Sequence, residues 1–400
     1  MCVPATALRL AERGVVAFAE VDWRGTWYSR HQLLSRLAQT CPVVVVRDPL
    51  DARDVLTGRG SKRPVLERIA PNLWDYRPPR FLPRLYRPAA AGRLLDRLRA
   101  RHLDASLRSL GLTNPVHYVF HPQYAPMLEL LPRRFTLYHC YDKYDAYQGA
   151  PVAMLQALER KLVSRSDLVL ASSRILAADI EERTGHAVRH LPHGVDFDSF
   201  RQRALHETPS DLAVLPRPRI GYVARLDERI DDAALREIAL QRPDWSVVII
   251  GGAGFQSADA DARFRALAAL PNVHALGAKP RDTIPAYTAG LDVCLLCYRT
   301  DNWGRYVQPI KAYEYLACGR PVVSAPIDAA RDFGDLVQVV PESGRWVEVI
   351  EAALAADGSE ASARRIEFAR ENSWDRRVEE LIALIEGKLA RDPGLQSPPC

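Results

Sequence analysis

Residues 309–323 read PIKAYEYLACGRPVV, and this stretch combines a helix signal with two charged side chains. The apolar spacing predicts a helix over residues 310–318 that ends at Gly319, after which Pro-Val-Val begins a buried strand. Lys311 and Glu314 lie three residues apart near the start of that helix, so they share one face. The stretch therefore predicts a helix with a charged N-terminal turn, followed by a strand.

Outward from this stretch, buried strands alternate with amphipathic helices, which is the pattern of parallel α/β sheets. In the second half we expect helices at 232–242 and 284–289 and strands at 220–224, 246–250, 273–276, 291–298 and 321–324. In the first half we expect helices at 29–38 and 152–164 and strands at 15–21, 43–46, 116–120, 135–139 and 168–171. Ser173 is placed to cap a helix that Gly185 ends.

The chain has 400 residues, of which 48% are hydrophobic, enough for two domains of about 180 residues each. Each half shows the doubly wound, Rossmann-like pattern, and Ser373 is placed to cap a last helix at residues 374–389. We expect an N-terminal domain, a C-terminal domain and a final helix with its tail, at residues 1–205, 206–372 and 373–400.

The composition excludes several classes of protein. The net charge of +5 is too small to indicate nucleic-acid binding. No run of about 18 uncharged apolar residues occurs, and the first twenty residues lack the order of a secretion signal. The seven cysteines have irregular spacings and form no disulfide framework, as expected where thiols stay reduced. These features predict a cytoplasmic protein.

The end of the strand expected to finish at Tyr298 is a candidate ligand site. In open α/β sheets, ligands bind beyond the carboxyl ends of strands, where helix N-termini favour phosphates. Lys311 can reach an anionic diphosphate, and Glu314 can accept two hydrogen bonds from ribose hydroxyls. An ordinary ion pair on the wet side of an amphipathic helix is the alternative.

The amino-acid sequence of residues 309–323 resembles the nucleotide-binding segment of GT-B glycosyltransferases of family 4 and of their relatives in bacterial polysaccharide assembly, including teichuronic-acid-type enzymes. PHGVD at 192–196 and NSW at 372–374 resemble two further stretches of that family, in order and at its spacing. The resemblance covers nearly the whole second half of the chain and the end of the first. It implies the GT-B fold, in which two Rossmann-like domains face each other across a cleft and a C-terminal helix crosses back to the first domain.

The resemblance also implies roles for residues of the second domain. Glu314 resembles the ribose-binding carboxylate, and Arg225, at the end of IGYVARL, resembles the diphosphate-binding arginine. The second basic residue of the family has no clean match, because Arg229 stands one position early. Gly252 and Gly254 follow the next strand, where glycine lets the donor approach the backbone closely.

The catalytic residue is expected in the first domain. Tyr306 stands where retaining members of the family carry a first glutamate, so retention is not implied. LYHCYDKYD at 137–145 resembles the strand-then-aspartate arrangement of the inverting xanthan-assembly glucuronosyltransferase, which implies Asp142 as the general base that takes the proton of the acceptor hydroxyl. Asp145 is the second candidate and His139 a further one. A loop-capping aspartate and a packed strand histidine are the alternatives.

Loops at strand ends supply candidate contacts to the two substrates. Asp301 and Asn302 precede the nucleotide helix and are candidates for the donor sugar, with a plain surface loop as the alternative. Candidates for the acceptor are four residues of the first domain: Arg24, Gly25, Trp27 and His121. Trp27 could instead pack between domains, since an indole serves either role.

We expect no cofactor beyond the donor itself, a UDP-sugar or another nucleotide diphosphate sugar, and no metal. Cys294 and Cys297 lie three apart on an expected strand, so their thiols point to opposite faces and cannot hold one ion. The glycines after residue 250 lack the third glycine of a dinucleotide fingerprint.

Residues 74–108 carry nine arginines against three aspartates, with aromatic and leucine side chains between them. This mixture suits an anionic lipid surface. We therefore expect peripheral docking on the inner membrane, where a glycan or a polyprenyl-diphosphate-linked acceptor is presented. A solvated basic helix and loop is the alternative.

Together these features predict an inverting, metal-independent glycosyltransferase of bacterial surface polysaccharide synthesis. A UDP-sugar 2-epimerase-like enzyme on the same fold and a non-catalytic nucleotide-sugar-binding module are the alternatives.

Overall fold

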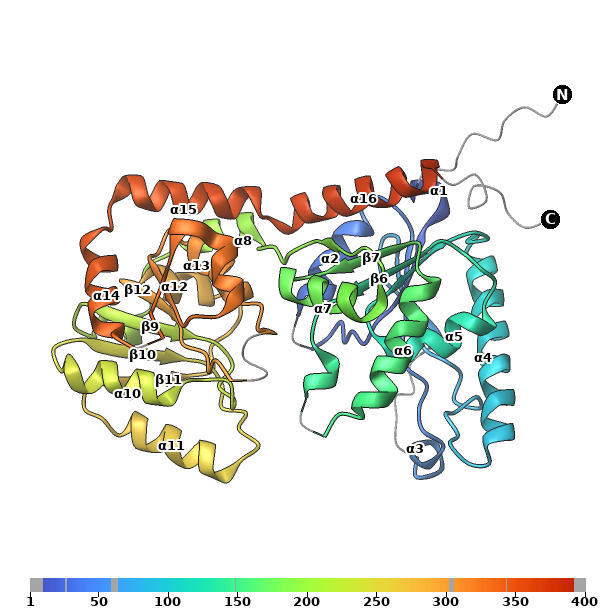
Figure 1. Ribbon diagram of the computed structural model, residues 1–400, viewed down its shortest axis with the longest axis horizontal. Helices are drawn as coiled ribbons and strands as arrows, with labels where there is room; N and C mark the ends of the chain where they lie inside the picture. The colour runs from blue at the N-terminus through green and yellow to red at the C-terminus, as the bar shows by residue number, and fades with distance from the viewer. Residues whose placement is uncertain are drawn as a thin grey trace. The chain divides into compact units, whose positions relative to one another are not determined.

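The structure is a computed structural model that describes residues 10–25, 27–58, 64–147, 149–301, 306–342 and 344–391. Contacts divide the chain into two compact units (Figure 1): Met1–Pro192 with Arg377–Cys400, and His193–Arg376. Each unit is built around its own mostly parallel sheet.

The division falls earlier than the sequence predicts. Residues 193–205 belong to the second unit, because helix α8 (Phe197–Arg203) buries Phe197 and Phe200 and contacts helix α13 (Ile310–Ala317) there. Helix α16 (Trp374–Arg391) begins in the second unit, and from Arg377 onward it belongs to the first.

The first unit contains an eight-stranded sheet in the order β3-β4-β2-β1-β5-β6-β7-β8. All neighbours are parallel except β3 and β4. Val15 pairs with Val43 on one side and Val116 on the other, and these strands are buried along their whole length, as valine-rich central strands of parallel sheets are. The strands are β1 (Val15–Phe18), β2 (Val43–Val46), β3 (Leu66–Ala70), β4 (Leu73–Tyr76), β5 (Val116–Val119), β6 (Thr136–Cys140), β7 (Leu168–Ala171) and β8 (Arg189–His190).

Helices connect these strands, and α16 adds buried Leu381, Ile385 and Leu389 to the same unit. Its other helices are α1 (Leu10–Arg13), α2 (Ser29–Leu37), α3 (Ala52–Leu56), α4 (Ala89–Ser109), α5 (Ala125–Leu130), α6 (Val152–Arg165) and α7 (Arg174–Thr184), with 3-10 turns η1 (Pro122–Tyr124) and η2 (Tyr144–Ala146).

The second unit contains a six-stranded, wholly parallel sheet in the order β11-β10-β9-β12-β13-β14. Its strands are β9 (Arg219–Val223), β10 (Ser246–Ile250), β11 (Val273–Gly277), β12 (Val293–Leu296), β13 (Val322–Ser324) and β14 (Val337–Val339). Its other helices are α9 (Ser210–Ala213), α10 (Asp232–Gln241), α11 (Ala258–Ala268), α12 (Ile284–Ala289), α14 (Trp346–Ala355) and α15 (Ser359–Glu371), with the 3-10 segment η4 (Asp328–Leu336).

The predicted strands and helices are present, with ends that differ by a few residues. The predicted caps of α7 are also confirmed: the Ser173 hydroxyl accepts a hydrogen bond from the Leu176 N–H at 3.1 Å, and Gly185 ends the helix with a φ of 70°. The sequence did not predict the β3–β4 hairpin. The arginine-rich stretch contains the 21-residue helix α4, in agreement with the basic helix and loop that were the alternative interpretation of that stretch.

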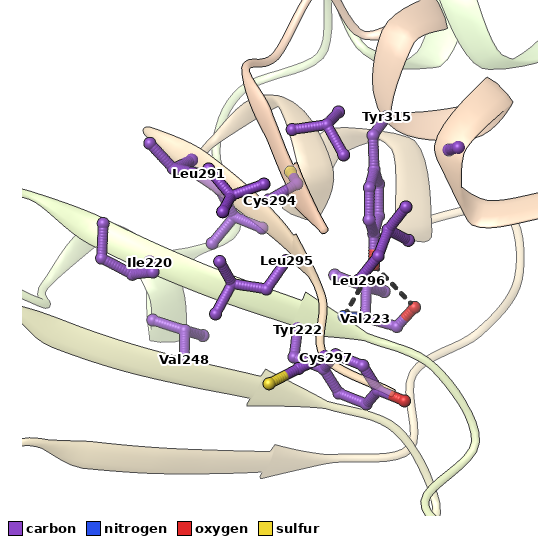
Figure 2. Packing of buried hydrophobic residues seen from close by; sticks show 14 of the residues in the cluster. Ile220, Tyr222, Val223, Val248, Leu291, Cys294, Leu295, Leu296, Cys297 and Tyr315 are labelled. Atoms are coloured by element: carbon purple, nitrogen blue, oxygen red, sulfur yellow. Dashed lines mark hydrogen bonds between the residues drawn. The ribbon is translucent and has the colours of Figure 1, made fainter. Parts of the chain in front are cut away.

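Buried side chains of β9 and β12 form the core of the second unit, and Figure 2 shows this packing around Leu295 and Tyr315. Gly221 on β9 pairs with Cys294 on the parallel strand β12, and a Cβ at Gly221 would lie 2.1 Å from the Leu291 side chain. Over the described residues, no helix is both long and apolar enough to cross a membrane.

Candidate functional site

Arg225 and Gly254 meet at the carboxyl edge of the second unit's sheet. Arg225 follows β9 and Gly254 follows β10, and the two loops are joined by hydrogen bonds from Leu226 N–H to Gly252 O (3.0 Å) and from Gly254 N–H to Leu226 O (2.8 Å). A Cβ on Gly254 would lie 2.6 Å from the Arg225 Nε. The absence of a side chain at Gly254 therefore leaves room for the exposed guanidinium, which forms no ion pair within the described part of the chain.

Helix α13 presents Lys311 and Glu314 at the same edge. The Lys311 Nζ lies 2.8 Å from the Glu314 Oε2, and both side chains are partly exposed. No side chain caps the start of α13 among the described residues, so the positive end of its helix dipole is not neutralised by a side chain there. A cation, a carboxylate and a helix N-terminus are thus close together in space.

Tyr315 holds α13 against β9. Its hydroxyl accepts from the Val223 N–H at 3.0 Å and donates to the Val223 carbonyl at 3.1 Å, as the dashed lines in Figure 2 show. Val223 is two residues before Arg225, and Tyr315 directly follows Glu314. This pair of bonds therefore fixes the distance between the two predicted donor-binding residues.

Arg229 and Tyr298 lie beneath this edge. Arg229 makes a two-pronged ion pair with Asp227, with the Nε 2.7 Å from an aspartate oxygen. The Tyr298 ring is buried against Tyr222, and burial raises its pKa to about 12. Tyr298 thus packs at the floor of the predicted donor site.

Two other predicted donor contacts have different outcomes. Asp301 is exposed and pairs with Arg299, 2.9 Å from its guanidinium. Asn302 lies outside the described residues.

In the first unit, Asp142 stands in the loop that follows β6. One carboxylate oxygen accepts a hydrogen bond from the Lys143 N–H at 3.0 Å, and the other accepts one from the Tyr147 hydroxyl. The side chain is partly exposed at the carboxyl edge of the sheet. These bonds fix the orientation of the carboxylate beside open solvent.

Asp145, the second candidate base, takes part in a largely buried network of ion pairs and hydrogen bonds. It lies 3.3 Å from the Lys143 Nζ and accepts a hydrogen bond from the Gln156 amide at 2.8 Å. Lys143 also pairs with Asp179 at 2.6 Å. The network and Asp142 line one pocket at this edge of the unit. Asp145 therefore supports the loop that carries Asp142.

His139 is packed in the core of β6. It is 1% exposed, its ring stacks beside Tyr118, and its Nδ1 lies 2.8 Å from the Tyr118 hydroxyl. Of the two interpretations that the sequence leaves open, the packed strand histidine describes this geometry.

The loop after β1 contains three predicted acceptor contacts. Arg24 pairs with Glu67 at 3.0 Å, and the Gly25 N–H donates to the Asp22 carbonyl. The Trp27 ring stacks on His31 and remains 37% exposed. Trp27 therefore offers an exposed ring face, while Arg24 already has a partner.

His121, the fourth acceptor candidate, follows β5 beside Tyr144, with ring centroids 4.3 Å apart. Its Nδ1 accepts a hydrogen bond from the Gln123 N–H at 3.1 Å. Burial first and the Arg30 charge second lower the pKa of His121 to about 4. His121 is therefore neutral near neutral pH.

The two cysteines of the β12 segment face opposite sides of the sheet, as predicted. The Cys297 thiol lies 3.6 Å from the Asp231 carbonyl beside α10, whereas Cys294 faces Cys318 at the end of α13. Burial raises the pKa of both thiols well above their ordinary value.

Two residues of the site are not identified from the sequence. Tyr315 belongs to the decisive stretch, yet its hydroxyl becomes meaningful only once β9 is beside it. Arg30 lies in the first turn of α2, near Tyr144 and Phe120. An unusual feature does mark it, because a cation in the first turn opposes the helix dipole.

Comparison with known proteins agrees with this architecture. The family model described as glycosyl transferases group 1 matches residues 217–357, inside the second unit. A putative teichuronic acid biosynthesis glycosyltransferase of Bacillus subtilis strain 168, TuaH, is 25% identical over 199 residues, which cover 47% of this chain and 49% of that protein. The match therefore spans about half the length of this curated relative.

Solved structures match over nearly the whole chain. The E. coli trehalose-6-phosphate protein bound with UDP-2-fluoro glucose has a TM-score of 0.69 at 12% identity, over 93% of this chain and 98% of that one. Sucrose-phosphate synthase from Thermosynechococcus elongatus has a TM-score of 0.65 at 19% identity, over 95% and 98%. HepE of Anabaena in complex with UDP and glucose has a TM-score of 0.63 at 16% identity, over 93% and 99%. Residues 217–357 thus match the glycosyl transferases group 1 model, in a chain that has the two-domain GT-B fold.

Proposed function

We propose that the protein transfers a sugar from a UDP-sugar to a hydroxyl of a glycan or lipid-linked acceptor in the synthesis of a bacterial surface polysaccharide. The group 1 domain supports sugar transfer. Structural neighbours solved with UDP-2-fluoro glucose, or with UDP and glucose, support a UDP-sugar donor. The teichuronic acid relative supports a polysaccharide acceptor.

The observation that carries the proposal is the grouping of Arg225, Lys311 and Glu314 at one sheet edge, with Tyr315 bonded to Val223 between them. The guanidinium and the ammonium can share the negative charge of a diphosphate, while the carboxylate accepts hydrogen bonds from ribose hydroxyls. Binding of the ribose to Glu314 would also release Lys311 from its present ion pair toward the phosphates.

Transfer then needs a base for the acceptor hydroxyl, and we assign this role to Asp142. As the acceptor oxygen forms its bond to the anomeric carbon, its proton passes to the Asp142 carboxylate and the bond to the nucleotide diphosphate breaks. Attack from the face opposite the diphosphate inverts the configuration. Arg225, Lys311 and the N-terminus of α13 stabilise the negative charge of the departing diphosphate, which is the role that a metal ion would otherwise have.

The test compares wild type, Asp142→Asn and the control Asp104→Asn, whose carboxylate forms an exposed pair with Arg108. Asp142→Asn should bind UDP-sugar normally and lose at least about 100-fold in transfer rate, because general base catalysis contributes on that order. The control should keep its activity. Transfer at an unchanged rate in Asp142→Asn, or a product with retained anomeric configuration by NMR, would contradict the assignment.

A panel of UDP-, GDP-, dTDP- and CDP-sugars identifies the donor by thermal shift, since ligands of the folded state raise the melting temperature. The same panel separates the alternatives. A 2-epimerase would convert its UDP-sugar without an acceptor, and a binding module would shift in melting temperature without turnover.

We also propose that the first unit docks peripherally on a membrane through α4 and the segment before it. The apolar side chains of Phe81, Tyr86 and Leu94 are 74%, 69% and 56% exposed. Exposed arginines lie among them, at positions 87, 93, 97 and 101. Four other arginines of the stretch, at positions 77, 84, 99 and 108, are engaged in ion pairs and contribute less to a membrane-facing charge.

Flotation with vesicles containing phosphatidylglycerol tests the docking. Changing Arg87, Arg93 and Arg97 to Glu should abolish flotation at moderate salt, since each basic residue near an anionic surface contributes about 1 kcal/mol. The triple change Arg263→Glu, Arg265→Glu and Arg331→Glu in the other unit alters the net charge by the same amount and is the matched control. Equal flotation of the triple variant and wild type would contradict the docking surface.

A further inference from the structure

Arg30 is a charged group of the first unit that the proposed reaction does not use. Its guanidinium carbon lies 5.9 Å from the Phe120 ring centroid and 6.0 Å from that of Tyr141. One of its nitrogens lies 3.4 Å from the Tyr144 hydroxyl. Across the described ranges, no carboxylate pairs with it. Arg30 is thus a largely enclosed cation that tyrosine and phenylalanine rings surround.

This environment is costly for a cation. A guanidinium has five N–H donors, and a single long hydrogen bond leaves most of them without a protein acceptor. Burial lowers the pKa of Arg30, but the nearby Tyr144 and Tyr141 raise it more, so the side chain stays charged. Its place in the first turn of α2 also opposes the helix dipole. Ring contacts recover part of this cost and fix the plane of the guanidinium.

Arg30 lies in the same part of the unit as the proposed base. The Tyr144 hydroxyl that contacts Arg30 donates to the Phe120 carbonyl at 2.7 Å. The Tyr144 ring is also 6.5 Å from the Tyr147 ring, and the Tyr147 hydroxyl donates to Asp142. A chain of two tyrosines therefore links the arginine to the carboxylate.

We propose that Arg30 binds an acidic group of the acceptor, either a phosphate or a carboxylate, close to the hydroxyl that Asp142 deprotonates. The inference rests on the proposed function, because it names the class of acceptor for that site. The planar fork of the guanidinium matches both groups with two parallel hydrogen bonds. The positive end of the α2 dipole favours the same anion.

An anion at this place offsets the free-energy cost of enclosing the partly buried charge. It supplies the missing counter-ion and reverses the unfavourable effect of the helix dipole. Neutral His121, on the other side of Tyr144, adds no competing cation. A neutral acceptor would leave the guanidinium desolvated without a partner, so the site discriminates against it.

The experiment uses the full chain with the donor site saturated by UDP, so that added anions cannot bind at Arg225 and Lys311. Inorganic phosphate, glucuronate and glucose are titrated by calorimetry into wild type, Arg30→Gln and Arg36→Gln. Arg36 lies on the same helix and bonds to Gln32, which makes it a matched control.

Wild type and Arg36→Gln should bind one of the two anions and not glucose, while Arg30→Gln should bind that anion about 10- to 100-fold more weakly, as expected for loss of a charged hydrogen-bond partner. Preference for phosphate indicates a lipid or sugar phosphate, and preference for glucuronate indicates an acidic sugar. Arg30→Lys, which keeps the charge but loses the fork, should be intermediate.

Equal anion affinity in wild type and Arg30→Gln, or no anion binding by folded wild type, overturns the inference. A melting curve shows whether Arg30→Gln folds. If it does not fold, anion binding by Arg30→Lys is the deciding measurement, and wild-type anion affinity in that variant overturns the inference. These titrations need no turnover. Anion binding at Arg30 can therefore be found where no sugar transfer is measured, and sugar transfer can be measured where no anion binds. The two proposals therefore stand or fall separately.

Discussion

A single methyl group at Gly254 should disable the donor site without weakening the fold. A Cβ there would lie 2.6 Å from Nε, 2.8 Å from Nη2 and 3.1 Å from Cζ of Arg225. Since carbon atoms keep about 3.5 Å from non-bonded heavy atoms, the guanidinium must move by roughly 1 Å. The atoms that clash are the far end of an exposed, flexible side chain, so stability should change little.

The magnitude follows from the short range of charged hydrogen bonds. Such bonds need about 2.7–2.9 Å between donor and acceptor, so a displacement of roughly 1 Å removes the contact to the diphosphate. A hydrogen bond to a charged group contributes about 1.5–3 kcal/mol. Gly254→Ala should therefore weaken UDP binding by about 10- to 100-fold.

Calorimetric titration of UDP into wild type, Gly254→Ala, Arg225→Ala and the double variant forms a double-mutant cycle. If Gly254 acts only by making room for Arg225, the double variant should bind no more weakly than Arg225→Ala. Gly358→Ala is the control, since a Cβ there meets nothing within 4 Å. Additive losses, or normal UDP binding by Gly254→Ala, would refute the reasoning.

Three further predictions concern stability, pH and the ribose contact. Gly251→Ala should unfold the second unit more easily by at least about 2 kcal/mol in urea, because its φ is 157° and a Cβ would lie 1.7 Å from the Ala224 carbonyl oxygen; an unchanged midpoint would contradict this. Burial lowers the pKa of His117 to about 3. Between about pH 6.5 and pH 3 the unfolded chain therefore binds a proton that the folded chain does not, and stability falls as the pH falls through that window. His117→Asn should reduce the slope of the unfolding free energy against pH by up to about 1.4 kcal/mol per pH unit. Glu314→Gln should leave the melting temperature unchanged and weaken UDP binding by about 10-fold, because the charged ribose acceptor is lost even though Lys311 is released. Equal affinity of wild type and Glu314→Gln for UDP would argue against that contact.

Much of the fold follows from short-range patterns. The Ser173 cap and the left-handed Gly185 are local features, so a single helix determines them. The lengths of β2 and β7 match the sequence prediction because runs of valine and leucine define both strands. The β3–β4 hairpin was missed because β3 is only partly buried and both strands carry charged side chains, which hides their alternation.

Which candidates are held in ion pairs is decided by partners that lie far away in the chain. Asp142 and Asp145 are equivalent in sequence, but Asp145 is engaged by Gln156 and Lys143, which in turn binds Asp179. Arg24 is paired with Glu67, from the hairpin that the sequence did not predict. Periodicity contains no information about such pairs, because it describes each element alone.

The sequence by itself determined that strands and helices alternate, and that Lys311 and Glu314 share a helix face, because both depend on spacing within one element. Tertiary structure alone decided that Arg225 folds over Gly254, 29 positions later. Parallel pairing of β9 with β10 brings the carboxyl ends of the two strands to the same edge, which makes the glycine necessary for the arginine. The environment of Arg30 in the first unit has the same origin. The rings of Phe120 and Tyr141 follow β5 and β6, whereas Arg30 lies on the helix that follows β1, and parallel pairing brings these strand ends together.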